Sequence, residues 1–134
     1  MKSYTYARAL QAALIGLAMT GSASLARADI KDYEFQLVDK TVKKGDAVIS
    51  VRLIHKPDGK PVSGAVIFAK RLDMAPDGME TMKTTIEPLP STEPGIYKFK
   101  AAVTMEGGWQ LSLGAKVQGE TGTVENKLVL KATP

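Results

Sequence analysis

The sequence predicts an all-β domain, an immunoglobulin-like sandwich of two antiparallel sheets with about seven strands. Hydrophobic and polar residues alternate with a period of two in several short runs, which is typical of half-buried strands. Proline- and glycine-rich turn signals separate these runs. After the N-terminal segment, no stretch of about ten residues or more shows the 3.6-residue period of an amphipathic helix.

Residues 1–28 have the pattern of a cleaved secretory signal. Basic residues charge its start, an apolar run covers residues 9–19, and residues 26–28 form an A-x-A cleavage motif. The apolar run is shorter than the roughly 18 residues that a membrane-spanning helix needs. We therefore expect export to the periplasm, no retained transmembrane segment, and a single domain formed by residues 29–134.

The charge of the exported chain is close to neutral. Three of the 18 basic side chains, Lys2, Arg8 and Arg27, lie in the signal, so 15 remain against 14 acidic ones. A nearly balanced charge gives no basis for a nucleic-acid partner or a basic membrane-binding surface. The chain has no cysteine, so packing and sheet hydrogen bonds must hold the exported fold without disulfides.

The first half of the chain is expected to contain three strands. Alternating apolar residues place the first two at residues 33–37 and 49–53, and Lys56-Pro57-Asp58-Gly59 has the composition of a β-turn. The third strand, residues 65–72, is apolar on both parities at its start, as in a strand that is covered on both faces. Residues 74–83 are then expected to form a loop around a Pro-Asp-Gly sequence.

The second half of the chain contains the clearest alternation of hydrophobic and polar residues. Residues 84–89 are expected to form a short strand, and residues 97–105 a longer one. Glu106-Gly107-Gly108 predicts a hairpin turn, after which residues 109–117 repeat the inward alternation on the return strand. Residues 121–131 supply the last strand.

After the signal, all the methionines of the chain fall in one third of it: Met74, Met79, Met82 and Met105. Thioether sulfur is a soft, neutral ligand that selects Cu(I) over hard cations, and it suits an oxidising compartment. The cluster is therefore a candidate site for Cu(I) or Ag(I). The alternative is that these flexible side chains fill irregular space where a loop crosses the end of the sandwich.

Two further residues are candidate members of this site. His55 has the inward parity of its strand and stands just before the turn, so it is either an imidazole ligand or a strand-end histidine bonded to backbone or water. Trp109 is either a core anchor or a ring stacked over the metal. Met105 and Trp109 flank one tight turn, so we expect them to lie close together.

Signatures of enzymes are missing from the sequence. It has no cysteine nucleophile, no G-x-S-x-G, no H-E-x-x-H, no P-loop and no G-x-G-x-x-G motif. We therefore expect no catalysis. A hydrolase that uses His55 is kept as a third alternative.

Three segments together resemble a known family: R-L-D-M-A-P-D-G-M-E-T-M at 71–82, P-G-I-Y at 94–97, and M-E-G-G-W-Q-L-S-L at 105–113. Their order resembles the FixH and YtkA-like domains of exported or membrane-anchored bacterial proteins. The resemblance implies an immunoglobulin-like sandwich associated with copper and heavy-metal transport or with the assembly of copper-containing oxidases. It also implies that the four methionines are metal ligands and that Trp109 lies beside them.

The sequence thus supports two function hypotheses of different classes. In the first, a periplasmic monomer binds Cu(I) through the methionines and passes it to a membrane efflux or cuproenzyme-assembly partner. In the second, a metal-free immunoglobulin-like module docks on a membrane transport or oxidase-assembly complex.

Overall fold

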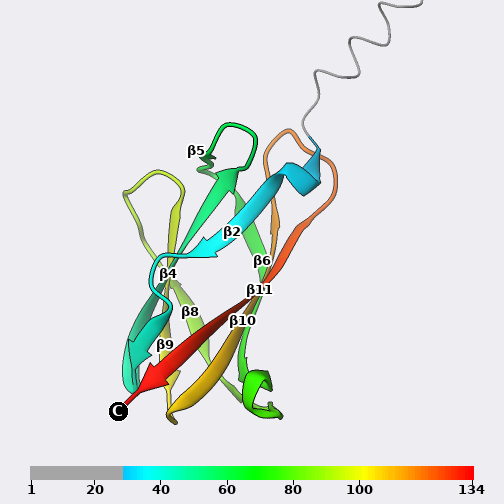
Figure 1. Cartoon of the computed structure of the whole chain (residues 1–134). Helices are drawn as coiled ribbons and strands as arrows, with labels where there is room; N and C mark the ends of the chain where they lie inside the picture. Colours follow the sequence, from blue (N-terminus) through cyan, green and yellow to red (C-terminus); the bar gives the residue numbers. More distant parts are fainter. Residues whose placement is uncertain (1–28) are drawn as a thin grey trace, which may run out of the picture.

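Two β-sheets packed face to face make up the part of the chain that the structure, a computed structural model, describes, residues 29–134 (Figure 1). The predicted signal lies outside these residues. Helical structure in the described part is limited to two 3₁₀ turns, η2 (Ile30–Asp32) and η3 (Ala75–Asp77). Neither turn could span a membrane, and residues 29–134 contain no other helix.

The first sheet has the strand order β2-β4-β9-β8, and the short β5 pairs with β4. All of its pairs are antiparallel. Its strands are β2 (Tyr33–Leu37), β4 (Gly45–His55), β5 (Lys60–Pro61), β8 (Ile86–Leu89) and β9 (Ile96–Val103).

The second sheet has the strand order β3-β11-β10-β6-β7. Its pairs are antiparallel except that of β3 with β11, which is parallel. Its strands are β3 (Thr41–Lys43), β6 (Val66–Met74), β7 (Met79–Thr84), β10 (Gly107–Lys116) and β11 (Val124–Thr133).

This strand order confirms the predicted immunoglobulin-like sandwich. In that fold, strands one, two, five and four of the seven form one sheet, and strands three, six and seven form the other. Here β2, β4, β9 and β8 form the first group, and β6, β10 and β11 the second. The two short strands β3 and β7 extend the second sheet at its edges.

The predicted hairpin between residues 97–105 and 109–117 is wrong. β9 and β10 belong to different sheets and do not pair, so residues 104–106 form a corner that crosses from one sheet to the other. Alternation cannot distinguish the two arrangements, because both strands turn one face to the same core in either case. The neighbour of β10 is β11 on one side and β6 on the other.

The region after the second strand also departs from the prediction in two places. The third strand is not covered on both faces at its start, since Val66 and Phe68 are 61% and 57% exposed. Only part of the predicted loop is irregular. The turn η3 occupies Ala75–Asp77, and Met79–Thr84 continues as β7 along the end of β6.

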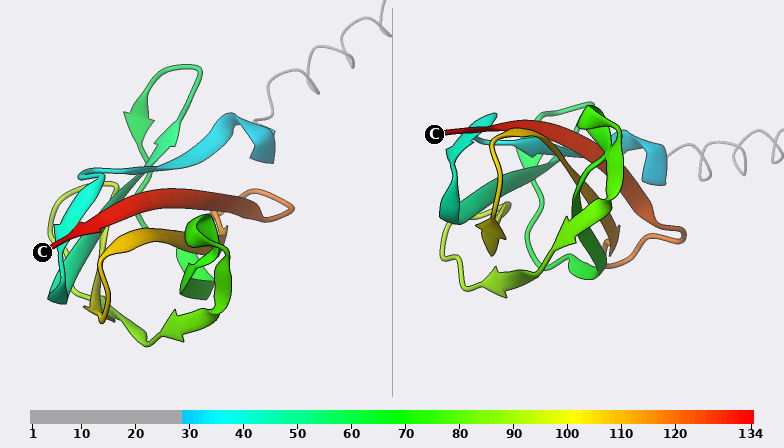
Figure 2. Two further views of the ribbon diagram at one scale, coloured as in Figure 1. Left: turned by 60° about the horizontal axis from the view of Figure 1, so that its bottom comes forward. Right: turned by 90° about the horizontal axis from the view of Figure 1, so that it is seen from below.

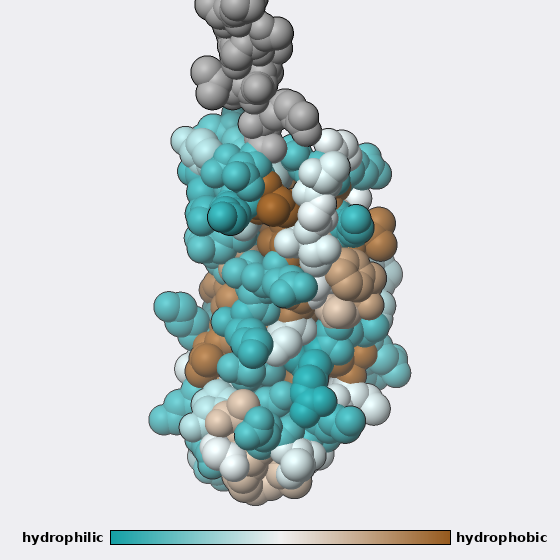
Figure 3. Space-filling model, turned by 90° about the vertical axis from the view of Figure 1, so that its right-hand side faces the viewer, coloured by the Kyte–Doolittle hydropathy of each residue, from teal (hydrophilic) through white to brown (hydrophobic). Residues whose placement is uncertain are grey.

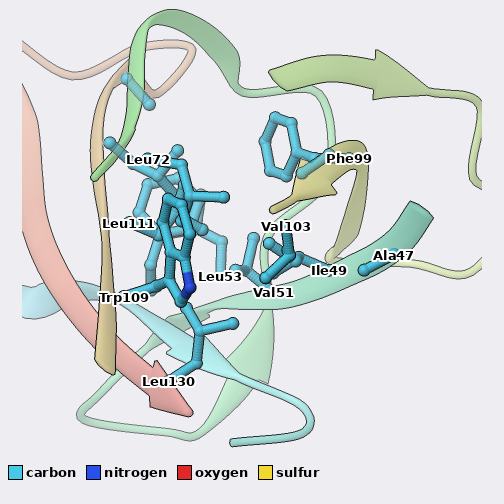
Figure 4. Packing of buried hydrophobic residues seen from close by; sticks show 14 of the residues in the cluster. Ala47, Ile49, Val51, Leu53, Leu72, Phe99, Val103, Trp109, Leu111 and Leu130 are labelled. Atoms are coloured by element: carbon cyan, nitrogen blue, oxygen red, sulfur yellow. The ribbon is translucent and has the colours of Figure 1, made fainter. Parts of the chain in front are cut away.

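The core lies between the two sheets. Trp109, Phe35 and Phe99 are the largest side chains that are fully buried in it. The indole of Trp109 lies in the layer between the sheets, near Leu111 and Leu130 of its own sheet (Figure 4). Every inward position of the predicted strands 49–53 and 109–117 is buried, so the sequence identified this core correctly.

The two flanks of the sandwich are closed differently (Figure 2). On one flank β2 and β11 lie side by side, and the backbone N–H of Phe35 donates to Asn126 Oδ1 at 2.9 Å. On the other, the chain passes from β7 in the second sheet directly to β8 in the first. Thr84 ties this crossing to β9 by donating from its hydroxyl to the carbonyl of Ala102 at 2.7 Å.

Candidate functional site

The fold brings the four methionines to one end of the sandwich. Met74 is the last residue of β6, and its Cα partner on β7 is Met79. Met105 lies in the corner between β9 and β10, two residues before Gly107. A Cβ added at Gly107 would come within 3.1 Å of the Met74 methyl carbon, which places this corner directly beside the end of β6. We call this end, with its four methionines, the methionine end.

The four side chains differ in exposure. Met74 is fully buried at 0% and belongs to the hydrophobic core, and Met79 is half-buried against that core. Met82 and Met105 are 38% and 39% exposed. The packing interpretation therefore holds for Met74, whereas Met82 and Met105 present their side chains to solvent. Met82 stands in an irregular stretch of β7, where the pairing register with β6 shifts.

The turn η3 covers the start of β10 at this end. The backbone N–H of Gly108 donates to Asp77 Oδ2 at 3.1 Å. An added Cβ at Gly107 would overlap the same carboxylate, and one at Gly108 would come within 2.9 Å of Pro76 Cβ. The Gly-Gly sequence thus does not form the predicted hairpin turn and has another role. It lets the turn between β6 and β7 approach the backbone closely.

A buried carboxylate holds the methionine end together. Asp73 is only 3% exposed, accepts a hydrogen bond from Arg71 Nε at 2.6 Å, and accepts another from the backbone N–H of Ala75 at 2.9 Å. Arg71 also donates to the carbonyl of Glu80 on β7 at 2.7 Å. Burial opposes the charge on Asp73, but the hydrogen bonds and the guanidinium of Arg71 outweigh it and lower the pKa of the carboxyl. Sequence reasoning missed this pair, because nothing in the sequence marks Asp73 as buried.

Trp109 is a core anchor that also ties down the corner. Its side chain is 1% exposed, and Nε1 donates to the carbonyl of Met105 at 2.9 Å. Immunoglobulin-like domains often place a tyrosine near the start of this strand, with its hydroxyl bonded back to the upstream backbone. Here an indole makes the equivalent bond. The expected closeness of Met105 and Trp109 is confirmed, but the ring is enclosed in the core and is not displayed at the surface.

His55 lies at the opposite end of the molecule. It is the last residue of β4, whose first residue, Gly45, pairs with Val103 beside the methionine end. At about 3.3 Å per residue, the length of this strand separates His55 from that end by roughly 30 Å. The structure therefore does not bring His55 together with the methionines, and its expected role in the same metal site is not supported by the geometry.

The surroundings of His55 are those of a strand-end histidine. Its Nδ1 lies 3.1 Å from Asp58 Oδ1 in the following turn, and its ring packs against that of Tyr33 at a centroid distance of 5.0 Å. Its Nε2 is buried without a hydrogen-bond partner in the described part of the chain. Across residues 29–134 no three His, Asp or Glu side chains are grouped so that they could hold a metal ion.

Comparisons with known proteins identify the family of this chain and structures that resemble it. A family model described as YtkA-like matches residues 27–114, which confirms the resemblance seen in the sequence. No curated protein matches this chain.

Among solved structures, the chain is similar to the ZirS C-terminal domain, with 12% identity over 100% of this chain and 80% of that chain and a TM-score of 0.46. It is also similar to FdeC, an Escherichia coli adhesin, with 15% identity over 81% of this chain and 32% of that chain and a TM-score of 0.42. The chain thus spans about a third of the length of FdeC.

Proposed function

The chain belongs to the YtkA-like family, and on this premise we propose that it is an exported Cu(I)-binding domain. In this proposal the domain works in the periplasm and passes the metal to a membrane efflux or cuproenzyme-assembly partner, without catalysing a reaction. The observation that supports it is the gathering of four methionines at one end of the sandwich, on segments far apart in the sequence.

The ligands in this proposal are the more accessible methionines. Met82 and Met105 are exposed, and Met79, which lies on β7 with Met82, is half-buried. These three thioethers form a soft and neutral donor set that suits Cu(I) or Ag(I) and not a hard cation. Neutral ligands bind without releasing a proton and permit release to a partner. Met74 is a buried member of the hydrophobic core and is not among the proposed ligands.

A titration of the purified protein with Cu(I) against a competing chelator tests this proposal. We expect uptake of Cu(I) by the parent protein and its loss when Met79, Met82 and Met105 are all changed to leucine. His55→Ala is the matched control, because it removes the one imidazole at the opposite end and should leave uptake unchanged. Equal uptake by the triple leucine variant and the parent would overturn the proposal.

We propose that the domain is a monomer, and one face of the molecule agrees with this. On the side of the molecule that carries η3 at its lower end, hydrophobic residues form small patches separated by hydrophilic ones (Figure 3). Soluble proteins commonly expose such isolated patches, whereas broad apolar patches mark stable interfaces.

A second candidate function, a metal-free interaction module, is favoured by one observation. The outer face of the second sheet exposes Val66 and Phe68, and the ring of Phe68 lies over Gly114, 3.4 Å from where a Cβ would stand. An exposed aromatic ring on a sheet is a suitable anchor for a partner. If Phe68→Glu abolished the biological activity while the triple leucine variant retained it, this function would replace the first.

A further inference from the structure

A cleft of about 300 Å³ opens between the two sheets, on the flank opposite β2 and β11. It lies between the first half of β6 and the segment that joins β8 to β9. Its apolar walls are formed by Ile67, Leu89, Ile96 and Phe99. Its volume is within the range of small-molecule sites, which begins at about 300 Å³.

The cleft exists because this flank is only half closed. β7 pairs with Leu72, Asp73 and Met74 at the end of β6. The first half of β6 has β10 on one side, and no strand of the described chain pairs with its other edge. The opposite flank is closed by β2 and β11 and by the hydrogen bond from Tyr33 to Glu120, of 2.9 Å.

A lysine stands on the inner face of the sheet at this cleft. Lys70 is the Cα partner of Leu113, and residues directly opposite each other on paired strands share a face. Leu113 is 3% exposed and points into the core, so Lys70 is on the inward side as well. Lys70 nevertheless remains exposed, because the sandwich is open at this position. In the described part of the chain it forms no ion pair.

The wall of the cleft also carries a hydroxyl with no partner. Ser91 Oγ is buried and makes no hydrogen bond in the described part of the chain. The nearby Tyr97 hydroxyl already has two partners, since it donates to the carbonyl of Val62 at 2.8 Å and accepts from the N–H of Ala65 at 3.1 Å. Burial raises the pKa of Tyr97, so this hydroxyl stays protonated and fixes the β5–β6 linker against the cleft.

We propose that this cleft binds a small amphipathic carboxylate, a molecule with one carboxylate and an apolar body. The carboxylate pairs with the Lys70 ammonium and accepts a hydrogen bond from Ser91, and the apolar body covers Ile67 and Phe99. Such a ligand gives the Lys70 ammonium an ion-pair partner and the Ser91 hydroxyl a hydrogen-bond partner, and it covers the apolar wall. The site is independent of the methionine end, so the Cu(I) proposal can fail while this one holds.

A simpler role for Lys70 is protection of the open edge, because inward-pointing charges prevent strand pairing between molecules. That role accounts for the lysine. It requires neither a cleft with apolar walls nor a buried hydroxyl without a partner, and the two roles differ in what they predict for ligand binding.

The test is a titration of the purified protein with 4-phenylbutyrate, followed by amide chemical shifts and by calorimetry. We expect shifts that are concentrated at residues 63–70 and 89–99, and binding that weakens at high salt. Lys70→Met keeps the length of the side chain and removes its charge, and it should weaken binding about tenfold. Lys116→Met, on the same sheet but outside the cleft, is the matched control and should bind like the parent.

Two further ligands distinguish the sources of the carboxylate. 4-Phenylbutylamine has the same apolar body with the opposite charge and should not bind. A short peptide with an apolar C-terminal residue is compared with its amidated form, and binding of the free acid alone would indicate that a protein C-terminus is the natural source. The proposal is overturned if 4-phenylbutyrate causes no shifts at the cleft, or if Lys70→Met binds it as tightly as the parent does.

Discussion

The indole Nε1 of Trp109 donates to the carbonyl oxygen of Met105 across the corner between the two sheets, at 2.9 Å. The same side chain is buried in the core with 1% exposure. One residue therefore couples the packing of the sandwich to the backbone position of an exposed methionine.

Replacement of Trp109 by phenylalanine removes the hydrogen bond to Met105 and part of the buried volume. We expect the free energy of unfolding to fall by about 1 to 3 kcal/mol, from the lost bond and the smaller ring together. Urea denaturation measures the loss, and amide hydrogen exchange at residues 104–107 should quicken. Unchanged exchange in this corner would show that the bond does not hold it.

The buried and exposed methionines should differ sharply in their contribution to stability. Met74→Ala opens a cavity in the core and should cost about 2 to 5 kcal/mol. Met82→Ala, at an exposed position, should change stability by less than about 0.5 kcal/mol. Thermal or urea denaturation of the two variants provides the comparison, and equal costs would contradict the burial described for Met74.

Asp73 should make the protein sensitive to acid. The pKa of Asp73 is lowered below its ordinary value of 3.8, because its hydrogen bonds outweigh the effect of burial. The folded state therefore favours the carboxylate, and this stability is fully present above the unfolded pKa and is lost as the pH falls through the folded pKa. Asp73→Asn lacks this contribution at every pH.

The stability difference between Asp73→Asn and the parent should therefore shrink as the pH falls below 3.8. Urea midpoints measured between neutral pH and acid pH give this difference. Asp46→Asn, at an exposed position on β4, is the control for the loss of one negative charge. A difference for Asp73→Asn that stays constant into acid would show that Arg71 and Ala75 do not stabilise the charge.

The close approach of η3 to β10 can be tested at Gly108, where the added Cβ of alanine would lie 2.9 Å from Pro76 Cβ. We expect Gly108→Ala to cost about 1 to 3 kcal/mol, which is typical of overpacking. Gly78→Ala is the comparison, because Gly78 has a φ of 75° and open space around it, so its cost reports backbone strain alone. If Gly108→Ala left stability unchanged, the turn would be free to move away from the strand.

Local pattern predicted most strands of the fold. The alternation at residues 33–37 predicts the first strand where β2 lies, and the alternation of residues 109–117 corresponds to β10. Local pattern could not predict which strands share a sheet. That assignment depends on which strand edges pair once the chain has folded back on itself. The strands that flank Gly107 and Gly108 have the alternation of a hairpin, yet they lie in two sheets.

The candidate site could be predicted only in part. The sequence indicated which residues were soft ligands, and the fold places all four methionines at one end. It could not indicate that Met74 is buried and Met82 exposed, because that depends on where β6 ends and where the register with β7 shifts. The sequence also could not indicate that Lys70 faces inward. The pairing of β10 with β6 shifts its register between Gly114 and Ala115, and this shift reverses which residues of β6 face the core.

The parallel pairing of β3 with β11 sets an order on folding. Residues Thr41–Lys43 have their partner at residues 131–133, and the Phe35 backbone N–H is bonded to Asn126, so segments about 90 residues apart in the sequence close one flank of the sandwich. Neither contact can form before β11 has been synthesised. Closure of this flank therefore depends on contacts of large sequence separation, which are typical of slowly folding β-sandwiches.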